Sequence, residues 1–116
     1  MLAALREYPG AIDEFDAAAA ADPARPGPPY ERGIARFDQR EYEQAIADFT
    51  RTLGLDPAHE GALLSRAASQ YRLQNIELSC QDWRQGCERR IAAACQLRVR
   101  HCVPEEADAP TPGSPQ

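Results

Sequence analysis

The chain has 116 residues, enough for one domain with one continuous core. Charged residues make up 27% and hydrophobic residues 43%, a balance that favours a folded chain over a disordered one. The formal net charge of −5 argues against a general nucleic-acid or anionic-membrane binder, and no stretch is long and apolar enough to cross a membrane. The first ten residues lack the basic start and apolar core of a signal peptide, so we expect a cytoplasmic protein, or an exported one if the native start lies upstream with a signal peptide.

The first predicted helix covers about residues 8–21. Its apolar positions recur at helical spacing: Ile12, Phe15, Ala18 and Ala19. Only residues 1–6 remain to form the helix that would cover this face. An uncovered terminal face favours either a truncated gene product or a surface meant for another chain. We therefore predict self-association or fraying at this open N-terminal end.

A proline-rich connector separates this helix from the next. Residues 22–29 contain four prolines and a glycine, so the second helix begins only near Pro28 or Pro29 and runs to about Gln39. A third helix is predicted from about Tyr42 to Leu53. The Asp56-Pro57 step that follows predicts an N-cap and a first helical residue for the fourth helix.

Three further helices complete the folded part. They are predicted at about Ala58–Leu73, Glu77–Glu88 and Ile91–His101. Residues 103–116 contain four prolines and no aromatic residue, and they predict a disordered tail.

The central stretch, residues 32–57, has a counterpart 34 positions away on either side. Toward the N-terminus the matches are Tyr42 with Tyr8, Ala45 with Ala11, Ile46 with Ile12, Phe49 with Phe15, Asp56 with Asp22 and Pro57 with Pro23. Toward the C-terminus they are Arg32 with Arg66, Asp48 with Asp82 and Phe49 with Trp83. A period of this length with small, aromatic and proline positions in register indicates a helix–turn–helix repeat. From residue 1 to about residue 102 the chain resembles the tetratricopeptide repeat (TPR) family.

This resemblance implies an all-α fold, a right-handed superhelical solenoid of antiparallel helix pairs. It divides the chain into a partial first repeat at 1–24, a second repeat at 26–59, a third repeat with a closing helix at 60–102, and the tail at 103–116. In the family, Gly33 and Ala67 match the small residue that lets two helices approach closely. The glycine usual in the turn within each repeat is replaced here by Arg6, Arg40 and Gln74. A left-handed residue other than glycine costs about 1 kcal/mol, so we expect Asn75 to take that role in the third repeat.

The family also implies a binding surface. TPR arrays hold an extended peptide or a partner helix on the concave face formed by the first helix of each repeat. Carried over by register, that face is Tyr30, Ile34, Phe37, Asp38, Leu64, Ala68, Tyr71 and Arg72. For Tyr30, Phe37 and Tyr71 the competing interpretation is packing within the chain. All 13 basic residues are arginine, so the lysines with which chaperone-binding members hold a terminal carboxylate are missing.

Four cysteines occupy the last two predicted helices, at Cys80, Cys87, Cys95 and Cys102. Cysteines seven apart in one helix stand about 10.5 Å apart along its axis, too far for a disulfide and unsuited to one four-cysteine zinc site. In an antiparallel hairpin that turns near Ile91, Cys80 faces Cys102 and Cys87 faces Cys95. Similar cysteines occur in a bacterial TPR variant. Reduced, buried thiols and two nested disulfides are both compatible with this arrangement; without a signal peptide the thiols are favoured.

The sequence contains no catalytic constellation. Its two histidines, His59 and His101, lie on different helices and are expected at the surface, and no phosphate loop, nucleophile elbow or HExxH motif is present. Arg32 and Arg66 occupy equivalent positions in the first helix of their repeats, and Glu14, Asp48 and Asp82 occupy equivalent positions in the second helix. We expect a recurrent, structural ion pair between these two rows of residues. A run of arginines near the C-terminus is expected to be a solvated face, with RNA binding as a weaker alternative: Arg84, Arg89, Arg90, Arg98 and Arg100.

We therefore expect a non-enzymatic protein–protein interaction scaffold without a cofactor or a metal site. The alternative, from another functional class, is a thiol-based redox or metal-responsive protein in which the four cysteines of the helical hairpin carry the function.

Overall fold

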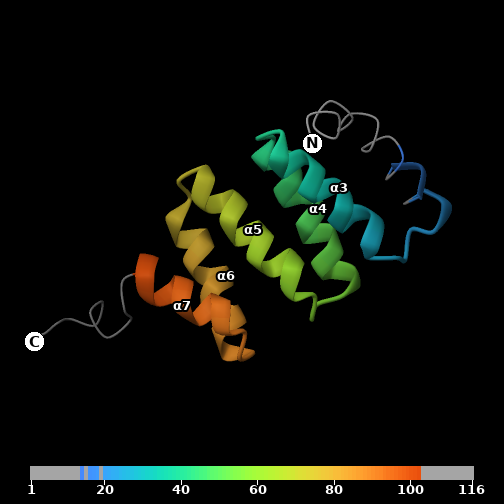
Figure 1. The fold of residues 1–116 in the computed structure, drawn as a ribbon. Coiled ribbons are helices and arrows are strands. Elements are labelled where there is room, and N and C mark those ends of the chain that lie inside the picture. The colour runs from blue at the N-terminus through green and yellow to red at the C-terminus, as the bar shows by residue number, and fades with distance from the viewer. Residues whose placement is uncertain (1–13, 15, 19, 103–116) are drawn as a thin grey trace, which may run out of the picture.

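A computed structural model describes residues 14, 16–18 and 20–102 of the chain. The predicted tail and most of the first predicted helix lie outside these residues, although the described positions 14, 16–18, 20 and 21 are helical. The helices that follow are α3 (Gly27–Asp38), α4 (Tyr42–Leu55), α5 (Glu60–Arg72), α6 (Ile76–Glu88) and α7 (Ala92–His101) (Figure 1). The described part of the chain contains no strand. The fold is therefore all-helical over this part, as predicted.

The start of α5 differs from the prediction. His59, and not Asp56, is the N-cap of this helix, because its Nδ1 accepts the Ala62 N–H at 3.0 Å. The Asp56 carboxylate instead accepts the Ala58 N–H at 3.2 Å and so forms a turn within the connector. The predicted assignment of Asp56 and Pro57 to the helix start is wrong. The helix begins at Glu60, two residues after the predicted Ala58.

The turns that join α3 to α4, α5 to α6 and α6 to α7 each use a left-handed residue that is not glycine. These residues are Arg40 (φ 66°), Gln74 (φ 65°) and Arg90 (φ 67°). The residue after each one donates its N–H to the carbonyl five positions earlier: Glu41 to Arg36 at 2.8 Å, Asn75 to Gln70 at 2.8 Å and Ile91 to Gly86 at 3.0 Å. This bond satisfies helix-terminal carbonyls that would otherwise lack a partner. The prediction that Asn75 is left-handed is wrong, since Asn75 (φ −85°) is the N-cap of α6.

Consecutive helices pack against one another along the chain, and α3 also contacts α5 (Figure 1). Small residues set the closest approaches between helices. A Cβ on Gly33 of α3 would lie 2.6 Å from the Phe49 ring of α4, and one on Gly86 of α6 would lie 2.7 Å from the Ala94 Cβ of α7. Glycine is therefore required at both contacts.

The core consists of two apolar clusters. One joins α5, α6 and α7 and contains Leu63, Ala67, Cys80, Trp83, Ile91 and Ala94. The other joins α4 and α5 and contains Ala45, Phe49 and Ala62, with side chains of α3 packed against it. Within the described residues, no helix is long and apolar enough to serve as a membrane span.

Candidate functional site

An arginine on α3 bonds one carboxylate on the helical segment before it and one on the helix after it. Arg32 donates from Nε and Nη2 to Asp48 Oδ1 of α4, at 3.0 and 2.6 Å. Its Nη1 donates to Asp16 of the preceding helical segment. The Asp48 side chain is only 2% exposed, so this pair is largely removed from water. The hydrogen bond that Arg32 donates to the Asp48 carboxylate favours the charged guanidinium and raises the pKa of Arg32.

The same arrangement recurs 34 residues later. Arg66 of α5 donates to both oxygens of Asp82 on α6, from Nε at 2.9 Å and from Nη2 at 2.8 Å. Its Nη1 donates to Thr50 Oγ1 of α4 at 3.2 Å. In both copies the arginine contacts one residue 16 positions before it and one 16 positions after it. We call each set an arginine clamp. The predicted ion pairs of Arg32 with Asp48 and of Arg66 with Asp82 are confirmed.

A second donor completes each clamp. Arg36 Nη1 lies 3.4 Å from Asp48 Oδ2. At the matching position of the next copy, the Gln70 amide donates to Asp82 Oδ2 at 3.2 Å when it is oriented to suit its neighbours. The carboxylate that Arg32 contacts in the preceding helical segment is Asp16, which matches Thr50 in the next copy, while the predicted Glu14 is exposed. The periodicity of the sequence thus reappears in the polar contacts between helices.

Several residues of the predicted binding face pack within the chain. The Tyr30 ring lies 4.5 Å from the His59 ring and 5.9 Å from the Phe49 ring. Ile34 packs against the cluster around Phe49, and Leu64 packs against the cluster around Trp83. The structure therefore assigns these three predicted residues to internal contacts. Ala68 is half-buried and Asp38 is exposed.

The remaining predicted residues gather where α3 and α5 end. The Arg72 guanidinium lies over the Phe37 ring, 5.5 Å from its centroid. Its Nη1 donates to the Tyr42 hydroxyl at 3.3 Å, and the Tyr42 ring meets Phe37 edge-on at 5.3 Å. A cation held over an aromatic face is stabilised by the ring quadrupole. The C-terminal ends of α3 and α5 are joined by this contact.

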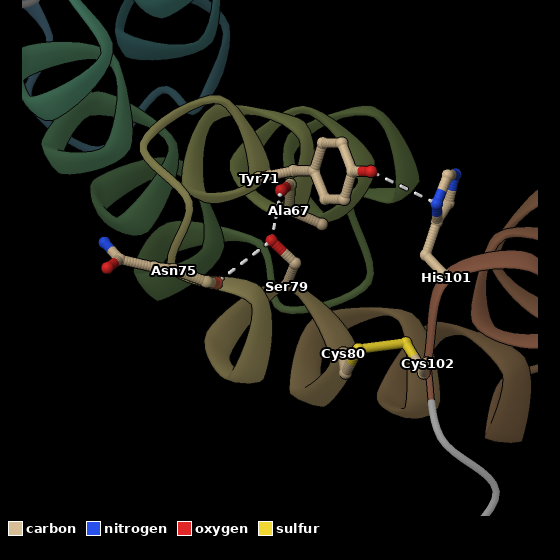
Figure 2. The surroundings of a disulfide bond; sticks show 7 residues. All are labelled: Ala67, Tyr71, Asn75, Ser79, Cys80, His101 and Cys102. Atoms are coloured by element: carbon tan, nitrogen blue, oxygen red, sulfur yellow. Dashed lines mark hydrogen bonds between the residues drawn. A yellow bond between two sulfur atoms is a disulfide. The ribbon is translucent and has the colours of Figure 1, made fainter.

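A second group of rings joins the ends of α5 and α7 (Figure 2). The Tyr71 ring lies 4.8 Å from the His101 ring, and the Tyr71 hydroxyl and His101 Nδ1 form a hydrogen bond at 3.3 Å. Trp83 of α6 lies beneath both, 5.8 Å from Tyr71 and 5.5 Å from His101. Trp83 is buried, whereas Tyr71 is 37% exposed. His101 is therefore not the isolated surface residue that was predicted.

We call the residues at these helix ends the aromatic edge: Phe37, Tyr42, Tyr71, Arg72 and His101. Sequence reasoning placed Phe37, Tyr71 and Arg72 in a binding face and missed Tyr42 and His101. Both missed residues sit at helix termini, where side chains of neighbouring helices meet. The 34-residue spacing that relates Tyr42 to Tyr8 is a signal that could have pointed to Tyr42. No such spacing identifies His101.

Two disulfides link α6 to the closing segment. Cys80 is bonded to Cys102, with their Cα atoms 5.8 Å apart, and Cys87 is bonded to Cys95, with their Cα atoms 4.5 Å apart. Figure 2 shows the first of these bonds beside Ser79, whose hydroxyl donates to the Ala67 carbonyl of α5 at 2.9 Å. The structure thus pairs the cysteines that the antiparallel hairpin places opposite one another. It contains them as disulfides, whereas the sequence favoured reduced thiols.

The C-terminal arginines are spread along the hairpin of α6 and α7. Arg89 donates to the Pro57 carbonyl, beside the turn into α7. Arg98 and Arg100 lie in the last turn of α7, roughly 10 Å or more further along the helix axis. Among the described residues, no group of three or more His, Cys, Asp or Glu side chains is arranged to hold a metal ion.

Neither a known protein family nor a characterised protein matches this chain in sequence.

Proposed function

We propose that this chain is a non-enzymatic protein–protein interaction module, built as a TPR-type right-handed solenoid. The observation that carries this proposal is the repeated arginine clamp. Two sets of side chains 34 positions apart make equivalent contacts across three successive helical segments. A helix pair that is joined in the same way to the pair before it and the pair after it is the unit of such an array.

The aromatic edge is the proposed centre of the binding surface. It combines a partly exposed tyrosine ring with the planar guanidinium of Arg72, and Tyr and Arg are the residue types enriched among interface hot spots. A guanidinium has five N–H donors in a flat fork. Of the three guanidinium nitrogens of Arg72, only Nη1 donates to an acceptor among the described residues, the Tyr42 hydroxyl. We infer that the ligand is an extended peptide or partner helix that places a carboxylate against Arg72 and an apolar group against Tyr71.

A peptide library displayed on phage, selected on the oxidised protein, tests this proposal. Selected peptides should bind Arg72→Ala and Tyr71→Ala at least tenfold more weakly than the unchanged protein, because truncating a hot-spot residue costs about 2 kcal/mol or more. Gln81→Ala is the matched control, since Gln81 is exposed on α6 and lies outside the edge. The selected peptides should also share an Asp or Glu at one position, the carboxylate that contacts Arg72.

Two results would contradict the proposal. One is a set of peptides that bind all three variants equally. The other is amide chemical-shift changes on peptide addition that map to the exposed surface of α4 and α6 and leave Phe37, Tyr71 and Arg72 unmoved.

The disulfides favour a second candidate, the thiol-based redox protein. The interaction scaffold and the redox protein are expected in different cellular compartments. Stable disulfides persist in oxidising compartments, whereas in a reducing cytosol they form transiently and serve in redox sensing. Fractionation combined with trapping of free thiols in the source cells would distinguish them. Permanently oxidised cysteines support a stapled scaffold, and cysteines that cycle between thiol and disulfide support the redox function.

A further inference from the structure

α7 has few apolar contacts of its own. Ala94 is its one fully buried residue among those described, and Ile91, its N-cap, is buried just before it. Leu97 is half-buried against the core, while Val99 is 77% exposed. The apolar contacts therefore belong mainly to the first half of the helix. The second half, residues 97–101, carries mostly exposed side chains.

The two disulfides act at opposite ends of α7. The turn disulfide, Cys87–Cys95, spans the turn between α6 and α7, which other contacts also hold in place. Ile91 N–H bonds the Gly86 carbonyl at 3.0 Å, and Ala94 packs directly on Gly86. The distal disulfide, Cys80–Cys102, holds the end at which apolar burial is smallest and at which His101 contacts Tyr71 (Figure 2). The His101 ring also lies 5.5 Å from the Trp83 ring at this end.

We propose that the distal disulfide is a redox-sensitive latch. Its reduction releases residues 97–102 from Trp83 and Tyr71, while the turn into α7 stays closed by the contacts of Ile91 and Ala94. The turn disulfide is not needed to keep α7 docked. This inference concerns the docking of α7 and holds whether or not the aromatic edge binds a peptide.

The reductant is a dithiol. Cys102 is partly exposed and Cys80 is buried, so the incoming thiolate attacks the Cys102 sulfur. A mixed disulfide forms on Cys102 as the bond to Cys80 breaks, and the Cys80 thiolate takes up a proton. The second thiol of the reductant then displaces Cys102 as a thiol and closes the reductant's own disulfide. Two electrons and two protons pass to the protein in total.

Release has two consequences at the surface. Trp83, now 3% exposed, loses the His101 ring that covers it. The aromatic edge loses His101, so a ligand that uses this residue binds only the oxidised form; this second consequence rests on the proposed function.

The experiment uses the full chain and reads α7 directly. Trp83 is the only tryptophan, so tryptophan fluorescence reports the surroundings of this one side chain, which include His101. Wild type treated with dithiothreitol, and oxidised C80S/C102S, should both show red-shifted emission. Both should also show at least tenfold faster amide exchange over residues 97–101 than oxidised wild type. Oxidised C87S/C95S is the matched control and should behave as oxidised wild type.

Exchange over α4 shows whether the rest of the fold is intact, and it should not change on reduction. The proposal is overturned if reduced wild type keeps its emission and its slow exchange over residues 97–101. It is equally overturned if C87S/C95S releases α7 as C80S/C102S does, or if reduction also accelerates exchange over α4. Peptide binding is not measured, so a failure here is separate from a failure of the proposed binding surface.

Discussion

The arginine clamp makes a quantitative prediction for Asp48→Asn. Asparagine has almost the same shape as aspartate, so the substitution removes the charge without creating a cavity. Asp48 accepts two hydrogen bonds from Arg32 and a longer one from Arg36. In the variant the amide must turn its NH₂ toward one of these donors or give up an acceptor. The loss is therefore electrostatic.

The structure sets the size of the effect. Removing one partner of a buried ion pair costs about 3–5 kcal/mol, because the other charge is left without compensation. Here the Arg32 and Arg36 side chains are 21% and 24% exposed, and water can solvate part of each guanidinium. We therefore expect Asp48→Asn to lower the free energy of unfolding by about 2–3 kcal/mol. In a domain of this size that corresponds to a fall in Tm of about 10–20 °C.

Thermal and urea unfolding followed by circular dichroism, with the disulfides kept oxidised, measure this loss. Glu43→Gln is the control, because it makes the same change of charge on the same helix at an exposed position in the first turn. It should cost less than about 1 kcal/mol, the usual size of a helix-dipole interaction. The reasoning is refuted if Asp48→Asn and Glu43→Gln unfold at the same temperature and the same urea concentration.

Four further substitutions test backbone geometry and packing. Arg40→Gly should raise the free energy of unfolding by about 0.5–1 kcal/mol, because a left-handed residue is favourable for glycine; a lower Tm would count against the turn as described. Gly54→Ala should stabilise by up to about 1 kcal/mol through helix propensity, since open space surrounds it. Gly33→Ala should instead destabilise, because the clash with Phe49 costs about 1–3 kcal/mol, and equal effects of these two substitutions in urea unfolding would contradict the packing. Ala45→Leu, at a fully buried position, should cost about 1–3 kcal/mol, and an unchanged Tm would show that the site has room.

Local sequence signals predicted the helices well. The prolines of residues 22–29 exclude helix until Gly27, and the observed α3 starts within two residues of the expected position. The cysteine pairing follows from the rise of a helix and an antiparallel turn near Ile91, and the Arg–Asp registers follow from the 34-residue period, so these contacts could be anticipated once the helices were placed.

Contacts between distant residues account for the errors. Asp56 suits an N-cap by local rules and His59 does not, yet the N-cap of α5 is His59, whose ring lies against Tyr30 of α3. His101 reaches Tyr71 and Trp83 because the chain reverses at Arg90, so its neighbours depend on the whole hairpin. The oxidation state of the cysteines depends on the compartment and the available reductants, which composition does not encode.

The arginine clamps also govern how the chain can change in length. Arg32 and Arg66 each take one partner from the helix before and one from the helix after, always 16 positions away. Deleting or inserting one or two residues within one of these helices would rotate a partner away from its arginine. Duplicating a whole 34-residue unit supplies every arginine with both partners again. Gene duplication and unequal recombination are therefore tolerated in whole units, and small insertions are confined to the connectors, where a longer loop leaves the faces of both helices unchanged.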